Sequence, residues 1–285
     1  MSTPPVSAAA RFRALLSRGT VVMPGAFNAL TARMIERSGF DAMYLSGASL
    51  ANSMVGVPDV GITTQSEAVY HATRCAAVTS IPIISDADTG FGGEENTART
   101  VREFEQAGLA GLHLEDQEFP KRCGHLPGKT LVPQAEFEAK VAVAAAARRD
   151  PAFFLIARTD ARGVTGYDDA VQRAHAYLKA GADAIFPEAL EGRAEFERFA
   201  RDVRAPLLAN MTEFGKTPAM SVAEFATMGY AMVIFPVTLM RLAMKAVERG
   251  LIELREKGTP AALLGEMQTR QELYELLGYE VRTGK

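Results

Sequence analysis

The sequence predicts an α/β fold, a (β/α)8 barrel of the TIM type with extra helices at its C-terminal end. Short apolar runs rich in β-branched residues recur along the chain, each run is followed by a helical pattern, and polar side chains gather where the runs end. Parallel strands that alternate with helices give this pattern. In a barrel of this class the catalytic residues lie at the carboxyl ends of the strands.

Eight apolar runs are the candidate strands, and a chain of 285 residues is long enough for a barrel of eight units. The runs cover residues 21–26, 41–47, 82–88, 111–116, 153–160, 184–189, 206–210 and 232–236. Helix periodicity fills the intervals, for example over 97–108 and 168–182, and several of these segments end at a glycine suited to a helix stop. An open doubly wound sheet is the structural alternative, but the chain has neither its glycine-rich phosphate-binding turn nor a clear switch point.

The composition indicates one large domain over residues 1–285 with a substantial core. Hydrophobic residues make up 48% of the chain, and no shift in composition suggests a second domain. The last stretch, about residues 251–285, carries more helix than a closed barrel needs.

The charge pattern argues against nucleic acid and membrane partners. Lys and Arg total 31 against 34 Asp and Glu, so the net charge is -3 and there is no basic excess to attract nucleic acid or anionic lipid. The N-terminal residues lack the pattern of a secretory leader, and no apolar run reaches the roughly 18 residues of a membrane span. We therefore expect a cytoplasmic protein whose two cysteines, Cys75 and Cys123, are reduced.

Polar side chains end six of the candidate strands, as the catalytic groups of a barrel should. In chain order they are Ser46 and Gly47, Asp86 and Asp88, His113, Glu115 and Asp116, Arg158 and Asp160, Glu188, and Asn210 with Thr212. We expect these groups to share one mouth of the barrel.

Two neighbouring strands each end in a pair of polar residues two positions apart. Alternate residues of a strand project to the same side, so Asp86 should point the same way as Asp88, and His113 the same way as Glu115. Carboxylates packed this closely repel each other unless a cation or a proton lies among them, and hard oxygen ligands suit Mg²⁺ or Mn²⁺. The pattern predicts a divalent metal site. The alternative is that these acids are solvated or paired in salt bridges.

Arginines are candidates for binding the carboxylates of a substrate, because a guanidinium group can donate two parallel hydrogen bonds to one carboxylate. Arg158 follows the apolar core of a candidate strand and stands out from the residues alone. Arg241 and Arg270 lie beyond the last strand, and on spacing alone they are predicted to be surface charges.

The segment KRCGH places a thiol among positive charges. Cys123 is flanked by Lys121, Arg122 and His125. Positive potential lowers the pKa of a thiol, so a reactive cysteine is predicted here, with a zinc ligand or an inert thiol as the alternatives. Cys75 lies in an apolar helical pattern and is predicted to be a core residue.

The order of several motifs resembles that of the isocitrate lyase and phosphoenolpyruvate mutase superfamily, over nearly the whole chain. The motifs are YLSG at 44–47, GVPDVGI at 56–62, DADTGFG at 86–92, LHLEDQ at 112–117, KRCGH at 121–125, ARTDA at 157–161, FPEA at 186–189, ANMTEFGKTP at 209–218 and MQTRQELY at 267–274. Each string alone is weak, but their order and spacing are specific. KRCGH resembles the gating loop of the lyases, where the cysteine is the catalytic acid, whereas mutases and phosphonate hydrolases generally carry other residues there.

The resemblance implies a role for each matching residue. Asp86 and Asp88 match the metal-binding carboxylates, while Glu115 and His113 match residues that hold the water shell of the metal, Mg²⁺ or Mn²⁺. Cys123 matches the catalytic acid, and Tyr44 or a metal-bound water is the candidate base. The matching substrate contacts are Ser46, Gly47, Ala48, Gly124, His125, Arg158, Glu188, Asn210, Thr212, Arg241 and Arg270. The resemblance thus moves Arg241 and Arg270 from surface charges to expected ligands.

The implied reaction is the metal-dependent cleavage of a small 2-hydroxy acid, 2-methylisocitrate, to pyruvate and succinate in propionate catabolism. The alternatives are a related lyase of isocitrate or 2,3-dimethylmalate, an oxaloacetate decarboxylase, and a non-catalytic dicarboxylate sensor. After Ser46 and Gly47 the chain has Ala48 and Ser49, where lyases of this kind tend to have further glycines, so the acid that is cleaved stays open. The resemblance also implies a homotetramer whose C-terminal helices exchange between neighbouring subunits.

Overall fold

Eight short parallel strands form the centre of the structure, a computed structural model that describes residues 6–124 and 126–279. The strands are β1 (Val21–Pro24), β2 (Met43–Leu45), β3 (Ile83–Asp86), β4 (Gly111–Glu115), β5 (Phe154–Thr159), β6 (Ala184–Pro187), β7 (Leu208–Asn210) and β8 (Met232–Phe235). Each strand lies within one of the predicted runs, so the strand predictions are confirmed.

Hydrogen bonds join the strands into a closed ring. One sheet has the order β2-β3-β4-β5-β6 and a second has the order β1-β8-β7, and all of these pairs are parallel. Parallel bridges link the two sheets at both edges, between Gly25 and Tyr44 and between Ile185 and Leu207. Strand β1 therefore lies beside β2, and β6 lies beside β7, which gives the predicted (β/α)8 barrel.

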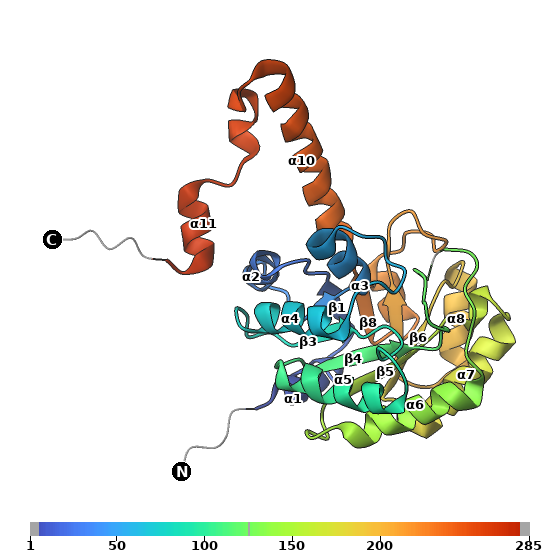
Figure 1. Cartoon of the computed structure of the whole chain (residues 1–285). Helices are drawn as coiled ribbons and strands as arrows, with labels where there is room; N and C mark the ends of the chain where they lie inside the picture. The colour runs from blue at the N-terminus through green and yellow to red at the C-terminus, as the bar shows by residue number, and fades with distance from the viewer. Residues whose placement is uncertain (1–5, 125, 280–285) are drawn as a thin grey trace, which may run out of the picture.

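Helices between the strands cover the outside of the barrel (Figure 1). They are α2 (Ala29–Arg37), α4 (Gln65–Ala76), α5 (Glu94–Gln106), α6 (Gln134–Ala147), α7 (Tyr167–Ala180), α8 (Arg193–Asp202) and α9 (Val222–Thr227). Shorter helices follow the carboxyl ends of two strands: α3 (Gly47–Ser49) and the π-helix η1 (Leu50–Val55) after β2, and the 3-10 helix η2 (Ala161–Gly163) after β5. The helices predicted over 97–108 and 168–182 correspond to α5 and α7. Helix α5 begins earlier than predicted, where Glu94 and Glu95 suit the positive end of the helix dipole. Helix α7 ends at Gly181, whose φ of 116° favours glycine.

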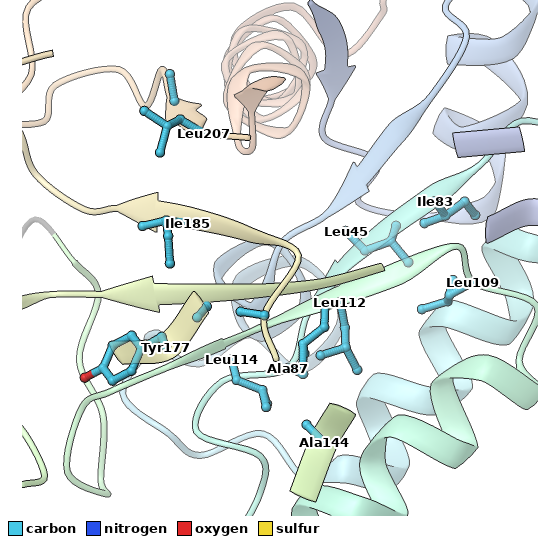
Figure 2. Packing of buried hydrophobic residues seen from close by; sticks show 14 of the residues in the cluster. Leu45, Ile83, Ala87, Leu109, Leu112, Leu114, Ala144, Tyr177, Ile185 and Leu207 are labelled. Carbon is cyan, nitrogen blue, oxygen red and sulfur yellow. The ribbon is translucent and has the colours of Figure 1, made fainter. Parts of the chain in front are cut away.

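Side chains alternate between the inside and the outside of the barrel and build two layers of core. The inner cluster is formed by inward side chains, among them Met23, Tyr44, Ile84, Ile156, Phe186 and Met232. Outward side chains such as Leu45, Leu112 and Ile185 belong to a second cluster that packs between the strands and the surrounding helices (Figure 2).

Helix α1 (Ala8–Leu16) closes the amino-terminal end of the barrel. Its first turn is capped by Ser7, whose side-chain oxygen accepts a hydrogen bond from the N–H of Ala10. Phe12 is fully buried in the inner cluster, and its ring meets the edge of Phe154, the first residue of β5, at a centroid distance of 5.2 Å. Apolar side chains fill this end of the barrel, which leaves the carboxyl end for polar groups.

Helix α10 (Thr238–Lys257) follows β8 but projects away from the barrel, and none of its residues is buried (Figure 1). The 3-10 helix η3 (Ala261–Glu266) and α11 (Arg270–Leu277) then turn back. Helix α11 lies near α2, where Nη2 of Arg37 is 3.5 Å from Oε2 of Glu275. The C-terminal helices therefore leave the barrel already at residue 238. Within the described ranges, no helix is both long enough and apolar enough to cross a membrane.

The substitution Phe12→Ala should destabilise the barrel, because it opens a cavity in the inner cluster below β5. We expect the free energy of unfolding, measured by urea denaturation, to fall by about 3–5 kcal/mol, as for other buried phenylalanines. Val6→Ala is the control, since Val6 is exposed and should change this free energy by no more than about 0.5 kcal/mol. Equal effects of the two substitutions would show that α1 does not close the barrel.

Candidate active site

Inward side chains change from apolar to polar at the carboxyl ends of the strands. The alternation that places Tyr44, Ile156 and Phe186 inside the barrel brings the next inward residue of each strand to the mouth. These residues are Ser46 after β2, Asp86 on β3, Glu115 on β4, Arg158 on β5, Glu188 after β6 and Asn210 on β7. The structure thus brings together groups from six strands that the sequence had singled out separately.

A cavity of about 290 Å³ opens at this mouth, which suits a small molecule. Of the residues singled out from the sequence, it is lined by Tyr44, Ser46, Ala48, Asp86, Cys123, Gly124, Arg158, Glu188, Asn210, Thr212 and Arg241. Asp88, His113 and Glu115 are buried beside these residues. Arg270 is exposed at the start of α11 and does not line the cavity, while His125 lies outside the described residues.

The turn after β2 approaches β3 so closely that it requires glycine. The N–H of Gly47 donates to Oδ2 of Asp86 at 3.1 Å, and a Cβ on Gly47 would lie 2.9 Å from the same oxygen. Ser46 caps α3, since its side-chain oxygen accepts a hydrogen bond from the N–H of Ser49. The backbone of this turn therefore helps to fix the Asp86 carboxylate.

Asp86 and Asp88 lie together, but not through the strand alternation that the sequence suggested. Strand β3 ends at Asp86, and Asp88 follows in a left-handed conformation with φ of 47°. The N–H of Asp88 donates to Oδ1 of Asp86 at 2.9 Å. Burial and the negative charge of Asp86 raise the pKa of Asp88 to about 6. Burial also opposes ionisation of Asp86, but the charges of protonated His113, Lys121 and Arg158 lower its pKa to about 2.

Lys121 and Asp59 belong to the site, although sequence reasoning assigned no role to Asp59 and predicted for Lys121 only an effect on the Cys123 thiol. Nζ of Lys121 lies 2.5 Å from Oδ1 of Asp59 and 2.6 Å from Oδ1 of Asp88, and its side chain is only 3% exposed. A buried ammonium group therefore joins two carboxylates from different loops. Asp59 stands in GVPDVGI and Lys121 in KRCGH, so both were visible in motifs, but no local pattern indicates that these loops meet.

His113 and Glu115 do follow the strand alternation, because both lie on β4 and face inward. Nε2 of His113 is 2.6 Å from the hydroxyl oxygen of Tyr44 and 3.5 Å from Oδ1 of Asp86. Burial lowers the pKa of His113 to about 4, so its ring is neutral at pH 7. Burial also raises the pKa of Tyr44 well above its ordinary value. A protonated phenol thus lies beside a neutral imidazole and can donate a hydrogen bond to it.

Asp160 fixes the orientation of Arg158. Nε and Nη2 of Arg158 donate to Oδ2 and Oδ1 of Asp160 at 2.9 and 3.2 Å. Nη1 points the other way, 3.2 Å from Oε2 of Glu115 and 3.5 Å from Oε2 of Glu188. Burial opposes ionisation of Asp160, but the charges of Arg158 and Lys129 lower its pKa to about 2. The guanidinium group therefore presents one edge to a buried carboxylate and the other edge to the acids of the site.

The buried carboxylates have the donor chemistry that a hard divalent cation needs. Neither carboxylate oxygen of Glu115 accepts a hydrogen bond from the described residues, and burial raises the pKa of Glu115 well above its ordinary value. A divalent cation near Glu115 would compensate for the missing hydrogen bonds and would lower the pKa of this carboxyl group. Among the described residues, no three His, Cys, Asp or Glu side chains lie close enough to hold one ion together. The arrangement therefore fits an ion that keeps water molecules between itself and some of its carboxylates, as Mg²⁺ usually does.

Residues 117–124, which we call the Cys123 segment, fold over the cavity. Gln117 holds it at two points, because Nε2 donates to the carbonyl of Arg122 at 2.8 Å and Oε1 accepts from the N–H of Arg122 at 2.9 Å. Gly124 approaches the barrel wall so closely that a Cβ there would lie 2.5 Å from Nη2 of Arg158. This approach places the neighbouring Cys123 in the lining of the cavity.

The two cysteines have different environments. Cys75 is fully buried in the outer core, as predicted, and burial raises its pKa to about 12. Cys123 is partly exposed and borders the cavity. Only the second thiol is in a position to meet a bound molecule.

The side of the mouth formed by β7 and β8 contributes further polar groups. Nδ2 of Asn210 donates to Oε2 of Glu188 at 3.3 Å, while Oδ1 of Asn210 is buried and accepts no hydrogen bond from the described residues. Thr212 follows in the lining. Arg241, on the first turn of α10, is ion-paired with Glu213 at 2.9 Å and has a side chain that is 40% exposed. This arginine can therefore turn toward a ligand at little cost in burial.

Comparisons with known proteins indicate where the chain belongs. The family model described as phosphoenolpyruvate phosphomutase matches residues 12–255. A 2-methylisocitrate lyase of Aeropyrum pernix is 51% identical over 262 residues, which cover 92% of this chain and 84% of that protein. A 2-methylisocitrate lyase of Bacillus subtilis is 48% identical over 273 residues, which cover 95% of this chain and 89% of that protein.

Solved structures share the fold. The crystal structure of 2,3-dimethylmalate lyase, described as a PEP mutase/isocitrate lyase superfamily member, matches with a TM-score of 0.92 at 37% identity and covers 96% of this chain and 93% of its own. Phosphonopyruvate hydrolase in complex with oxalate and Mg²⁺ matches with a TM-score of 0.86 at 31% identity and covers 96% of this chain and 95% of its own. With its sequence and fold matched over most of its length, this chain belongs to the phosphoenolpyruvate phosphomutase family, within the superfamily that includes isocitrate lyase.

Proposed function

We propose that this chain is a lyase that cleaves 2-methylisocitrate to pyruvate and succinate. Several relatives that are 42% to 51% identical over most of the chain are 2-methylisocitrate lyases. The structural observation that carries the proposal is the Cys123 segment, which folds over a cavity lined by Asp86, Glu188 and Arg158. A thiol in this place can donate a proton to a carbon atom of a bound acid.

The reaction removes one proton and delivers another. The hydroxyl group of the substrate loses its proton, the carbon–carbon bond beside it breaks, and the hydroxyl carbon becomes the ketone of pyruvate. The electron pair of the broken bond stays on the other fragment, which becomes succinate when it takes a proton from Cys123. Tyr44 is the candidate base. Tyr44 lines the cavity, but burial and the negative charge of Asp86 raise its pKa, so the charges of Arg158 and Lys121 would have to stabilise the phenolate that accepts the proton.

Asp86, Asp88 and Glu115 are the residues that would hold Mg²⁺ or Mn²⁺, with His113 behind Asp86. When bound, the ion would supply positive charge that stabilises the alkoxide and orients the adjacent carboxylate. The buried carboxylate of Glu115, whose oxygens accept no hydrogen bond from the described residues, supports this assignment. The complex of phosphonopyruvate hydrolase with Mg²⁺ is consistent with it.

The remaining residues of the site would bind and enclose the substrate. Arg158 would bind a carboxylate through its Nη1 edge, and Oδ1 of Asn210 would accept a hydrogen bond from the substrate. We assign the other substrate contacts to Ser46, Gly47, Ala48, Gly124, His125, Glu188, Thr212, Arg241 and Arg270.

A second candidate substrate is 2,3-dimethylmalate, because the lyase of that acid has the same fold with a TM-score of 0.92. Its cleavage would use the same base, acid and metal, but this substrate has one carboxylate fewer. Cleavage of isocitrate, decarboxylation of oxaloacetate and a sensor without activity are not favoured by the names of the relatives.

We also propose a cytoplasmic homotetramer in which the C-terminal helices pack on a neighbouring subunit. Leu242, Met244 and Leu251 on α10 are 64%, 56% and 61% exposed, which is unusual for apolar side chains of one helix. Between α2 and the barrel an apolar hollow of about 310 Å³ is left open beside β1 and β8, where a helix of the neighbour would fit. In such an assembly Arg270, which does not line the cavity of its own chain, would reach the site of a neighbour.

The purified chain should release pyruvate from 2-methylisocitrate when Mg²⁺ is present. Release should stop in excess EDTA and return when Mg²⁺ is added, because the alkoxide formed from the substrate would lack a stabilising positive charge without the ion. The measurement is pyruvate formation from 2-methylisocitrate, 2,3-dimethylmalate, isocitrate and oxaloacetate in parallel assays. Pyruvate release from oxaloacetate alone would show that the chain is a decarboxylase and not a lyase of 2-methylisocitrate. Full activity in excess EDTA would show that the reaction does not need a metal.

The substitution Cys123→Ser should lower kcat by about 10²- to 10⁴-fold, the range over which a positioned general acid contributes. Substrate binding, measured by calorimetry, should be nearly unchanged, because the arginines and the carboxylates of the site are intact. Cys75→Ala is the control, since that thiol lies in the core away from the cavity. An unchanged kcat for Cys123→Ser would exclude this thiol from the reaction.

The mass in solution, measured by light scattering, should be four times the 30.7 kDa of the chain. Introducing a charge at an exposed apolar position of α10, as in Leu251→Glu, should reduce this mass, because the charge would be buried against the neighbour. A monomeric mass for the unaltered chain would contradict the assembly.

A further inference from the structure

We propose that Lys129 is a positioning residue that keeps the Cys123 segment folded over the cavity. The inference rests on the proposed function, in which the thiol must reach the bound acid. It assigns a role to a lysine that lies outside the motifs of the sequence and does not line the cavity.

The ammonium group of Lys129 bridges the Cys123 segment and the barrel wall. Nζ donates to the backbone carbonyl of Gly124 at 2.5 Å and to Oδ1 of Asp160 at 2.6 Å. The side chain of Lys129 is 3% exposed and that of Asp160 is fully buried, so water competes little with this bridge. Hydrogen bonds with a charged donor are stronger than neutral ones, above all when they are shielded from water.

The carboxylate that receives this bridge is itself rigidly placed. The N–H of Asp160 donates to Oδ1 of Asp116 at 2.9 Å, and the hydroxyl of Thr159 donates to Oδ2 of Asp116 at 2.7 Å. Tyr177 on α7 donates to the same Oδ2 at 2.9 Å. Asp160 is therefore anchored by buried groups from β5, the end of β4 and α7, and it can serve as a fixed point for the segment that covers the cavity.

The same carboxylate also orients the arginine of the site. Asp160 accepts two hydrogen bonds from Arg158 and one from Lys129, so one buried group sets both the guanidinium and the loop that covers it. If residues 122–124 swing away while Lys129 stays on Asp160, the bond to the carbonyl of Gly124 is lost and Lys129 keeps one of these two partners. A buried ammonium group that loses a partner is costly. The closed arrangement is favoured for this reason.

The test is hydrogen–deuterium exchange of the segment over 117–133 in the full chain, compared with Lys129→Met. The amides of Glu118, Arg122 and Leu126 donate to acceptors within this loop, so their exchange reports loss of its folded conformation. We expect the exchange of these amides to be faster in Lys129→Met by about tenfold or more, as for the loss of one hydrogen bond to a charged group. Helix α6, which follows in the chain, should exchange as before. Lys179→Met, at an exposed position of α7, is the matched control and should change neither region.

Steady-state kinetics supply a second readout that a merely structural role would not move. In Lys129→Met we expect kcat to fall by about tenfold or more while KM stays within about twofold, because Arg158 remains bound to Asp160 while the thiol is less often in place. Unchanged exchange over 117–133 would overturn the proposal. So would an equal increase in α6, which indicates general loosening, or a raised KM with unchanged kcat, which indicates an effect on substrate binding alone. If the unaltered chain cleaves none of the acids, the proposed function fails, and the exchange experiment still decides the role of Lys129.

Discussion

The closure of the strands into a ring is the constraint on which the site depends. Because side chains alternate along each strand, closure forces every second residue into the same narrow interior. The lower levels of that interior are apolar and end on Phe12 of α1, so the polar residues at the last inward positions have only one place to meet. The site is therefore a direct product of strand register, and its members need not be near one another in the chain.

Several carboxylates lie close together at the mouth of the barrel and repel one another, and buried cations among them reduce this repulsion. Two cations, Lys121 and Arg158, are buried among the acids, and each contacts at least two carboxylates. Isolated buried charges would be unstable, but paired and hydrogen-bonded ones are tolerated. The acids differ in consequence. The positive groups around Asp86 lower its pKa, whereas burial raises the pKa of Glu115, so neighbouring carboxylates differ in how much positive charge they need to stay ionised.

The sequence allowed the strands and most of the lining of the cavity to be predicted, because both follow from local periodicity. Asp88 shows the limit of that reasoning. It lies beside Asp86 through a left-handed turn and not through strand geometry, and a two-residue spacing cannot distinguish the two. The pairing of Lys121 with Asp59 was missed because it joins two loops 62 residues apart. The position of Arg270 relative to the cavity could not be predicted from the sequence, because it depends on where the helices after β8 pack.

Gly124 has a consequence for how enzymes of this family can diversify. Because this position carries no side chain and presses on Arg158 and Glu188, the covering segment forms part of the cavity wall with main-chain atoms. Any side chain added at Gly124 would collide with Arg158 and Glu188 and push the Cys123 segment outward, so this part of the wall cannot be changed by substitution. Discrimination between acids of different size must then be adjusted at side chains elsewhere in the lining, such as Ala48 and Phe186. The catalytic closure and the choice of substrate can in this way change independently of each other.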